Sequence, residues 1–238
     1  MAEQVAFNRD CMEAMKEFPD KFFDLAVVDP PYGIGYDKAA SKQGNEQYGK
    51  AKAKKRFYHG ANWDAQRPDK SYFDELFRVS QKCIIWGGNY FADMLPPSKG
   101  FVCWDKRVND AMTNDFADCE YAYMSESLGV ARMFRFCWSG MIQGNMKNKE
   151  ERIHPTQKPV ALYVWLYKRY AKKGDKILDT HLGSGSSRIA AYDAGLDFWG
   201  YEIDKFYFEE QEKRFERHTS QINLFLDSEQ IDLFSGKD

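Results

Sequence analysis

The sequence predicts an α/β fold in which helices cover both faces of a doubly wound, mostly parallel sheet. Short apolar runs, such as residues 25–28, indicate buried strands, and these runs alternate with helical segments along the chain. Two of the strands end at an acid followed by turn-forming residues, at Asp29 and at Asp179. Because ligands bind at the carboxyl edge of an open parallel sheet, both acids are candidate site residues.

The expected elements run in order from a strand over residues 5–8. A helix over 12–18 ends at Pro19, and the strand over 25–28 follows it. Pro159 suits the first turn of a helix that runs to Tyr170, with Gly174 at its C-terminal end. The other expected strands cover residues 82–86, 101–104, 121–124, 176–179 and 198–201, and the other helices cover 72–79, 189–194 and 206–215.

Composition narrows the class of protein. The 238 residues fit one domain or one domain with an appendage, and the net charge is only −2. No apolar run reaches the length of a membrane span, and the N-terminus lacks a secretory signal, so we expect a cytoplasmic protein without a membrane partner. Five scattered cysteines with no CxxC pair, and four scattered histidines, indicate reduced thiols and no metal site.

The segment Asp29-Pro30-Pro31-Tyr32 directly follows the strand over 25–28. The two prolines fix the turn and leave carbonyl oxygens as acceptors, while Asp29 adds a carboxylate and Tyr32 a flat ring. Acceptors beside a stacking surface suit a planar molecule that carries an amino group, such as a nucleobase. The alternative is an ordinary turn, because Asp and Pro both favour turns.

A second motif covers residues 176–187. A short strand ends at Asp179, and the turn Gly183-Ser184-Gly185 leads into a helix whose N-terminus offers unpaired N–H groups. Glu202 ends the next strand about 20 residues later, where an acid can hold ribose hydroxyls. A nicotinamide-binding fingerprint is the rival interpretation, but its third glycine would fall on Arg188.

These motifs, in this order, resemble the amino-directed, S-adenosylmethionine-dependent DNA methyltransferases of the β arrangement, in which the catalytic motif precedes the cofactor-binding glycine loop. The resemblance covers most of residues 5–217 and implies a Rossmann-like fold with permuted motif order and small recognition insertions. It also rests on residues 8–11, 85–91 and 154–159. The sequence departs from the family pattern at His181, where Phe is usual, and at Thr180, where Pro is usual.

The resemblance implies a role for each motif. The catalytic motif would be Asp29, Pro30, Pro31 and Tyr32, with the amine bonded to Asp29 and to the Pro30 carbonyl, and with a flipped-out base stacked on Tyr32. The cofactor would be held by Asp10 at its adenine, Asp179 at its methionine moiety, Glu202 at its ribose, Thr156 and Lys158 near its carboxylate, and by the loop residues His181, Gly183, Gly185 and Ser186.

The first residue of the catalytic motif bears on the substrate. In the family, Asp is commoner in enzymes that methylate adenine, Ser in those that methylate cytosine, and Asn in related enzymes that modify protein glutamine. Asp29 therefore favours the exocyclic amine of adenine in double-stranded DNA. The alternatives are the cytosine amine and, from another class, a DNA-binding protein without activity.

A basic, mobile loop is expected over residues 37–70. Residues 38–58 carry seven Lys or Arg and a single acid, Glu46. The proposed phosphate contacts are Lys50, Lys52, Lys54, Lys55 and Arg56. The alternative is a solvated loop, which is what most charge runs are. A target-recognition region is expected over about residues 105–152, where the family places it.

The expected domain boundary separates a catalytic domain over 1–218 from an acidic tail over 219–238. The tail contains two near-copies, at residues 221–225 and 230–234, that begin with Gln and end with Leu-Phe. Each resembles the short peptide by which bacterial DNA-processing proteins dock on the replication sliding clamp. The alternative is that these Leu and Phe side chains pack on the protein's own core. The sequence indicates no oligomeric state.

Overall fold

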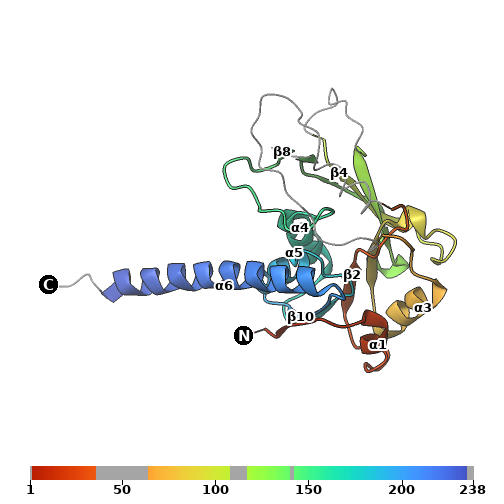
Figure 1. The fold of residues 1–238 in the computed structure, drawn as a ribbon, viewed down its shortest axis with the longest axis horizontal. Coiled ribbons are helices and arrows are strands. Elements are labelled where there is room, and N and C mark those ends of the chain that lie inside the picture. Colours follow the sequence, from red (N-terminus) through yellow and green to blue (C-terminus); the bar gives the residue numbers. More distant parts are fainter. Residues whose placement is uncertain (1, 36–63, 108–116, 140–141, 235–238) are drawn as a thin grey trace.

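The protein is built on an eight-stranded sheet, with the strand order β1-β10-β9-β2-β3-β5-β4-β6 (Figure 1). This computed structural model describes residues 2–35, 64–107, 117–139 and 142–234, with side chains described as far as residue 221. The strands are β1 (Gln4–Phe7), β2 (Leu25–Val28), β3 (Cys83–Trp86), β4 (Gly100–Asp105), β5 (Cys119–Met124), β6 (Arg132–Arg135), β9 (Lys176–Asp179) and β10 (Asp197–Tyr201), and a separate ribbon pairs β7 (Trp138–Ser139) with β8 (Ile142–Gln143).

The sheet is mostly parallel, as the sequence predicts. Strands β1, β10, β9, β2 and β3 pair in parallel, and so do β4 and β6. Among the described strands of this sheet, only β5 runs antiparallel to its neighbours, β3 and β4. Strands β6, β7 and β8 fall within residues 125–152, where the sequence alone indicated no strand.

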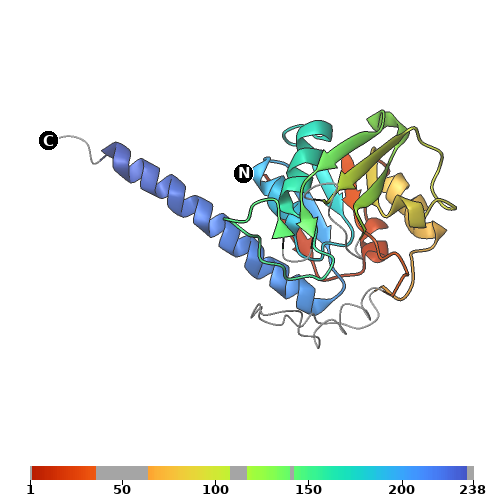
Figure 2. The same cartoon turned by 90° about the horizontal axis from the view of Figure 1, so that it is seen from above.

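Helices cover both faces of the sheet (Figure 2). Alternate residues of β2 show why: Leu25 and Val27 join one buried cluster, and Ala26 and Val28 join the other. The first cluster is closed by α4 (Val160–Tyr170) and α5 (Ser186–Asp193), and the second by α1 (Cys11–Met15) and α3 (Lys70–Val79). Two short 3₁₀ helices, η2 (Gly88–Tyr90) and η3 (Glu126–Leu128), follow β3 and β5.

Several large aromatic side chains are packed in the core. Tyr163 and Tyr167 are buried on α4. Trp104 is 1% exposed and donates its indole N–H to the Phe136 carbonyl, and Trp138 is 7% exposed and donates to Gln157. Neither indole is therefore presented on the surface for stacking on DNA.

The last helix is longer than the sequence predicted. Helix α6 (Lys205–Phe234) has 30 residues and crosses the expected boundary at 218/219 without a break. Both ribbon views show its C-terminal half projecting away from the body (Figures 1 and 2). The side chains of both Gln-to-Leu-Phe repeats beyond residue 221 lie outside the described residues. No helix in the described part of the chain is both long and apolar enough to cross a membrane.

Candidate active site

The carboxyl ends of four neighbouring parallel strands carry the predicted site residues. Asp10 follows β1, Glu202 follows β10, Asp179 ends β9, and Asp29 follows β2. Since β1, β10, β9 and β2 are adjacent in the sheet, the four acids come together at one edge although they span nearly 200 positions of sequence. The catalytic motif and the glycine loop therefore lie side by side, as predicted.

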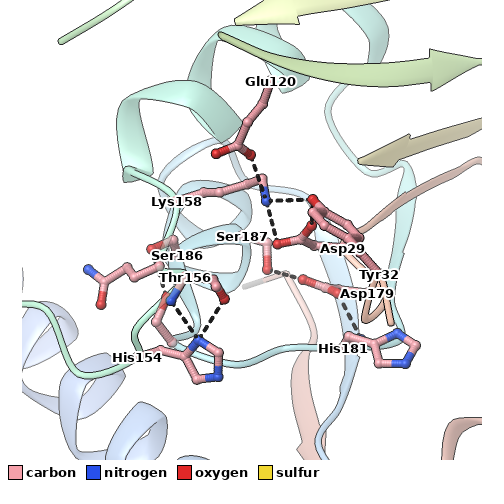
Figure 3. Close-up of polar contacts among 12 residues, drawn as sticks. Asp29, Tyr32, Glu120, His154, Thr156, Lys158, Asp179, His181, Ser186 and Ser187 are labelled. Carbon is pink, nitrogen blue, oxygen red and sulfur yellow. Dashed lines mark hydrogen bonds and ion pairs between the residues drawn. The ribbon is translucent and has the colours of Figure 1, made fainter. Parts of the chain in front are cut away.

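Asp29 is the centre of a cluster of side chains (Figure 3). Its Oδ1 accepts a hydrogen bond from the Tyr32 hydroxyl at 2.6 Å, and its Oδ2 accepts one from the Lys158 ammonium at 2.5 Å. Lys158 Nζ also lies 3.3 Å from the Tyr32 hydroxyl oxygen and 3.2 Å from Glu120 Oε2. Glu120 comes from β5 and Lys158 from the segment before α4, so three distant parts of the chain build this cluster.

Burial and charge set the protonation of the cluster. Burial raises the pKa of Asp29, and the Lys158 ammonium opposes that rise. Burial alone would lower the pKa of Lys158, but Asp29 and Glu120 together raise it above its ordinary value. Burial alone would raise the pKa of Glu120, but Lys158 and Lys106 bring it below its ordinary value. Lys158 is therefore a charged side chain that is only 4% exposed, held between two carboxylates.

The turn that follows Asp29 is held by Asp64. The backbone N–H groups of Tyr32 and Gly33 both donate to Asp64 Oδ1 at 2.8 Å. Asp64 is 2% exposed, and its own carbonyl accepts from Gly35. Because the prolines of the turn donate no N–H, these two bonds fix the position of the Tyr32 backbone.

The ring of Tyr32 is packed against the segment that follows β3. It stacks on Tyr90 with ring centroids 4.8 Å apart and an interplanar angle of 16°. Gly87 brings its backbone against the same ring, since a Cβ there would lie 2.2 Å from Tyr32 Cε1. Gly87 also has a φ of +71°, which favours glycine. The predicted segment over 85–91 thus shapes the surroundings of Tyr32.

The glycine loop is held by backbone contacts to the acids. Glu202 accepts from the N–H of Gly183 at 2.8 Å and from that of Asp204 at 2.9 Å. Asp179 accepts from the His181 N–H at 3.1 Å and from the Ser187 hydroxyl at 2.5 Å (Figure 3). Burial raises the pKa of Asp179 to about 7, although both of these bonds act to lower it.

The helix after the loop begins at a left-handed residue. Gly185 is the N-cap of α5 with a φ of +73°, and a Cβ there would approach Gln211 at 3.1 Å. The Ser186 hydroxyl accepts from Arg214 on α6 at 2.9 Å, and Arg214 also donates to the Ser184 carbonyl. Hydrogen bonds from Arg214 therefore connect the loop to α6.

Two half-buried histidines near the loop have lowered pKa values. His154 Nδ1 accepts from the Thr156 N–H at 3.3 Å and lies 3.0 Å from its hydroxyl, and burial lowers the pKa of His154 to about 3. His181 Nδ1 lies 2.9 Å from the Thr180 hydroxyl oxygen, and burial lowers the pKa of His181 to about 4. Tyr72 lies edge-on to the His181 ring, so His181 occupies an aromatic environment where the family usually has Phe.

The structure adds a contact that the sequence did not predict for Lys158, because its ammonium pairs with Asp29 and Glu120. Its expected place near the carboxylate of a cofactor stays a prediction. Asp10 caps helix α1 through the N–H groups of Met12 and Glu13, a contact that the sequence did not predict. The basic-loop residues Lys50, Lys52, Lys54, Lys55 and Arg56 lie outside the described residues.

Sequence reasoning missed Glu120, Asp64 and Tyr90. Glu120 directly precedes the strand expected over 121–124, Asp64 follows the basic run, and Tyr90 lies in the 85–91 segment but was given no role of its own. None belongs to the catalytic motif or the glycine loop. Only the sheet order, which sets β5 next to β3, could have brought Glu120 toward Asp29.

Comparison with known proteins shows which proteins this chain is similar to. A family model described as "DNA methylase", of N6 and N4 methyltransferases, matches residues 132–213. The type II methyltransferase M.HpaI of Haemophilus parainfluenzae is 20% identical over 91% of this chain and 74% of its own length. The type II methyltransferase M2.DpnII of Streptococcus pneumoniae is 30% identical over 65% of this chain and 49% of its own length.

The fold has solved counterparts. The PvuII DNA methyltransferase, described as cytosine-N4-specific, superposes with a TM-score of 0.58 over 95% of this chain and 94% of its own, at 12% identity. Such a likeness concerns the fold, which is the α/β fold predicted from the sequence. The chain spans about half to three quarters of the length of the two curated relatives described above. The family model, these relatives and the site geometry agree, and the chain is similar to the N6/N4 class of S-adenosylmethionine-dependent DNA methyltransferases.

Proposed function

We propose that this enzyme methylates the exocyclic amine of adenine in double-stranded DNA after flipping the base out of the helix. The observation that carries the proposal is the Asp29-Pro30-Pro31-Tyr32 turn, which sits beside the glycine loop at the carboxyl edge of the sheet. The amine of adenine is a poor nucleophile because its lone pair is delocalised into the ring. Hydrogen bonds to Asp29 and to the Pro30 carbonyl would localise that lone pair on the nitrogen.

The residues of the glycine loop fit the cofactor. Asp179 is a buried acid whose pKa is raised to about 7, so a cationic ligand beside it would relieve the cost of its burial. We propose that Asp179 faces the methionine moiety, Glu202 the ribose and Asp10 the adenine. Gly183, Gly185, Ser186, His181 and Thr156 would form the rest of the pocket. When bound, S-adenosylmethionine supplies an activated methyl group on its sulfonium.

The chain's own residues have to align and desolvate the amine, which requires neither a metal nor a covalent intermediate. Tyr32 offers a ring on which the flipped base can stack, and this contact partly replaces the stacking lost in the duplex. Asp64 accepts hydrogen bonds from the backbone N–H groups of Tyr32 and Gly33, and these bonds fix the backbone that carries the ring. After methyl transfer, the amine gives up one proton, and Asp29 is the base within reach.

The cytosine amine is the second candidate, because it presents a similar amino group and the PvuII enzyme is described as cytosine-N4-specific. A methyl-transfer assay from tritium-labelled cofactor to DNA, followed by nucleoside analysis, separates the two. We expect N6-methyladenine. Recovery of N4-methylcytosine alone would move the proposal to cytosine, and no transfer to any DNA would favour a binding protein without activity.

We propose that the basic run contacts DNA phosphates. Replacing Lys50, Lys52, Lys54, Lys55 and Arg56 by Gln should then weaken binding to all sequences alike and lower the slope of affinity against salt concentration. Affinity measured over a series of salt concentrations tests this. An unchanged slope would mean that the run is merely solvated.

We also propose, from the repeats at 221–225 and 230–234, that the C-terminal segment docks on a bacterial sliding clamp. Docking would bring the enzyme to newly replicated, unmethylated DNA. The double variant Leu233→Ala with Phe234→Ala should weaken clamp binding without lowering methylation of short duplexes. If the intact protein shows no clamp binding at tens of micromolar, roughly 6 kcal/mol of affinity, this part of the proposal fails.

A further inference from the structure

The Asp29 carboxylate already has a donor at each oxygen. The Tyr32 hydroxyl bonds to Oδ1, and the Lys158 ammonium bonds to Oδ2. The proposed function, on which this inference rests, needs Asp29 to accept a hydrogen bond from the target amine. A neutral amine competes poorly with an ammonium for a carboxylate, because the bond between two charged groups is the stronger one. Each carboxylate oxygen can accept a second hydrogen bond, but the amine would bond more strongly to Asp29 if the Lys158 ammonium shifted away from it.

Glu120 provides the place to which Lys158 can move. Its Oε1 accepts from Lys106 at 3.0 Å, while its Oε2 lies 3.2 Å from Lys158 Nζ. Glu120 Oε2 is buried, and among the described residues its ion pair with Lys158 Nζ lacks hydrogen-bond geometry (Figure 3). A full hydrogen bond from the ammonium would therefore stabilise this buried oxygen.

We propose that Glu120 is a positioning residue that receives the Lys158 ammonium when the target amine bonds to Asp29. The shift is small, because Nζ already lies within ion-pair distance of both carboxylates. A buried ammonium that lost Asp29 with no second carboxylate at hand would be strongly destabilised. Glu120 removes that obstacle, so Lys158 stays paired and charged in both positions.

Glu120 connects the catalytic motif to the proposed recognition region over residues 105–152, in which it lies. Glu120 lies on β5, and Lys106 directly follows β4. The pairs Lys106–Glu120, Glu120–Lys158 and Lys158–Asp29 form a continuous chain of charges from this hairpin to the catalytic motif. A contact that moves the β4–β5 hairpin would therefore also move the second position for Lys158.

The first test is the variant Glu120→Gln, which keeps the shape of the side chain and removes its charge. We expect kcat to fall about tenfold, because a neutral acceptor competes less well for Lys158, while the KM for DNA and the affinity for the cofactor stay near wild type. Glu75→Gln is the matched control, since Glu75 on α3 also pairs with a cation, Arg78, and is not among the groups that shift the pKa of Asp29.

The second test reads Asp29 directly and needs no turnover. A titration of the Asp29 carboxyl by ¹³C NMR, in the protein without DNA, should give a lower pKa in Glu120→Gln, because the Glu120 charge raises it. It should give a higher pKa in Lys158→Met, because the ammonium lowers it. The other ionisable groups that act on Asp29 or Glu120, and that stay unchanged in both variants, are Tyr32, Tyr163, Asp179 and Lys106.

A double-mutant cycle completes the design. If Glu120 acts through Lys158, adding Glu120→Gln to Lys158→Met should change kcat far less than it does in the wild type. Wild-type kcat in Glu120→Gln, or two fully additive effects, would overturn the inference. If the wild type transfers no methyl group to DNA, the proposed function fails, whereas an Asp29 pKa that is unchanged in Glu120→Gln would count against Glu120 alone.

Discussion

The two halves of the active edge are held together in different ways. In the cofactor half, the acids bind backbone N–H groups within 19 positions of sequence: Asp179 binds His181, and Glu202 binds Gly183 and Asp204. In the catalytic half, Asp29 binds Lys158 across 129 positions, and Lys158 in turn meets Glu120 from another strand. The cofactor half is thus built locally, and the catalytic half depends on the whole sheet.

The comparison shows that a sequence motif can contain the reactive groups of a site without containing the residues that support them. The glycine loop carries most of its own scaffold, so a short stretch of sequence encodes its shape. The catalytic turn carries its acceptors and its ring, but its charge balance and its packing come from Glu120, Lys158 and Tyr90. Substitutions in the two halves should therefore fail in different ways.

The largest effect should come from Asp29→Ala. This change removes the acceptor for the amine, so methyl transfer should fall about a thousandfold. Cofactor affinity, measured by isothermal titration calorimetry, should stay within a few-fold of wild type because the glycine loop has its own scaffold. Turnover close to wild type would remove Asp29 from the catalytic role.

The next effect should come from Gly87→Ala. A methyl group at this position would lie 2.2 Å from the Tyr32 ring, so the ring has to move, and kcat/KM should fall on the order of a hundredfold. Gly129→Ala is the control for backbone strain, because Gly129 also has a positive φ, +96°, but faces open space. If both variants lose the same activity, backbone strain alone accounts for the result.

A smaller effect should come from Glu202→Ala in the cofactor half. Loss of the bonds to the Gly183 and Asp204 N–H groups should loosen the loop and weaken cofactor binding about tenfold. Since the catalytic half is intact, kcat at saturating cofactor should recover. A loss of kcat that high cofactor concentration does not restore would mean that the two halves are not independent.

The smallest effect concerns His181→Phe, which should leave activity near wild type and change the response to acid. Burial lowers the pKa of His181 to about 4, below its ordinary 6.5, so the folded state excludes a proton that the unfolded chain binds. The stability that this group contributes above pH 6.5 is lost as the pH falls from 6.5 toward 4.

Phe cannot take up a proton, so the variant should gain about 2 kcal/mol relative to wild type between pH 7.5 and pH 5. Urea unfolding at both pH values measures this difference. His154, whose pKa burial also lowers, is unchanged and gives both proteins the same residual acid sensitivity. An equal loss of stability on acidification in both proteins would contradict the prediction.

The sequence was sufficient for the parts of the molecule that are set by local pattern. Apolar runs and terminal acids located β2, β9 and β10, and the glycine turn predicted the helix α5, although α5 begins at Ser186 and not at the expected residue 189. Prediction from the sequence failed for contacts between distant residues and for short strands without a clear alternation of apolar and polar residues. Strand β6 has exposed charged residues at both ends, Arg132 and Arg135, so nothing in its composition indicated a strand.

The end of α6 was missed for a related reason. Residues 216–234 are polar with scattered apolar positions, which indicated a tail, yet the backbone continues the helix to Phe234. The contact between the Lys158 ammonium and Asp29 was not predicted, because sequence spacing does not show which distant side chains meet. Charge pairing across 129 positions follows only from the folded sheet.

Helix α6 is anchored at one end and reaches outward at the other. Arg214, in the N-terminal half of the helix, contacts Ser184, Ser186 and Glu150. The 13 residues from 222 to 234 form its C-terminal end and are about 20 Å long at 1.5 Å per residue. A continuous helix of this kind works as a spacer arm. A partner bound at the C-terminal end would be held away from the body by a length equal to about six base pairs of duplex. That length would set the distance along DNA between the bound partner and the methylated base.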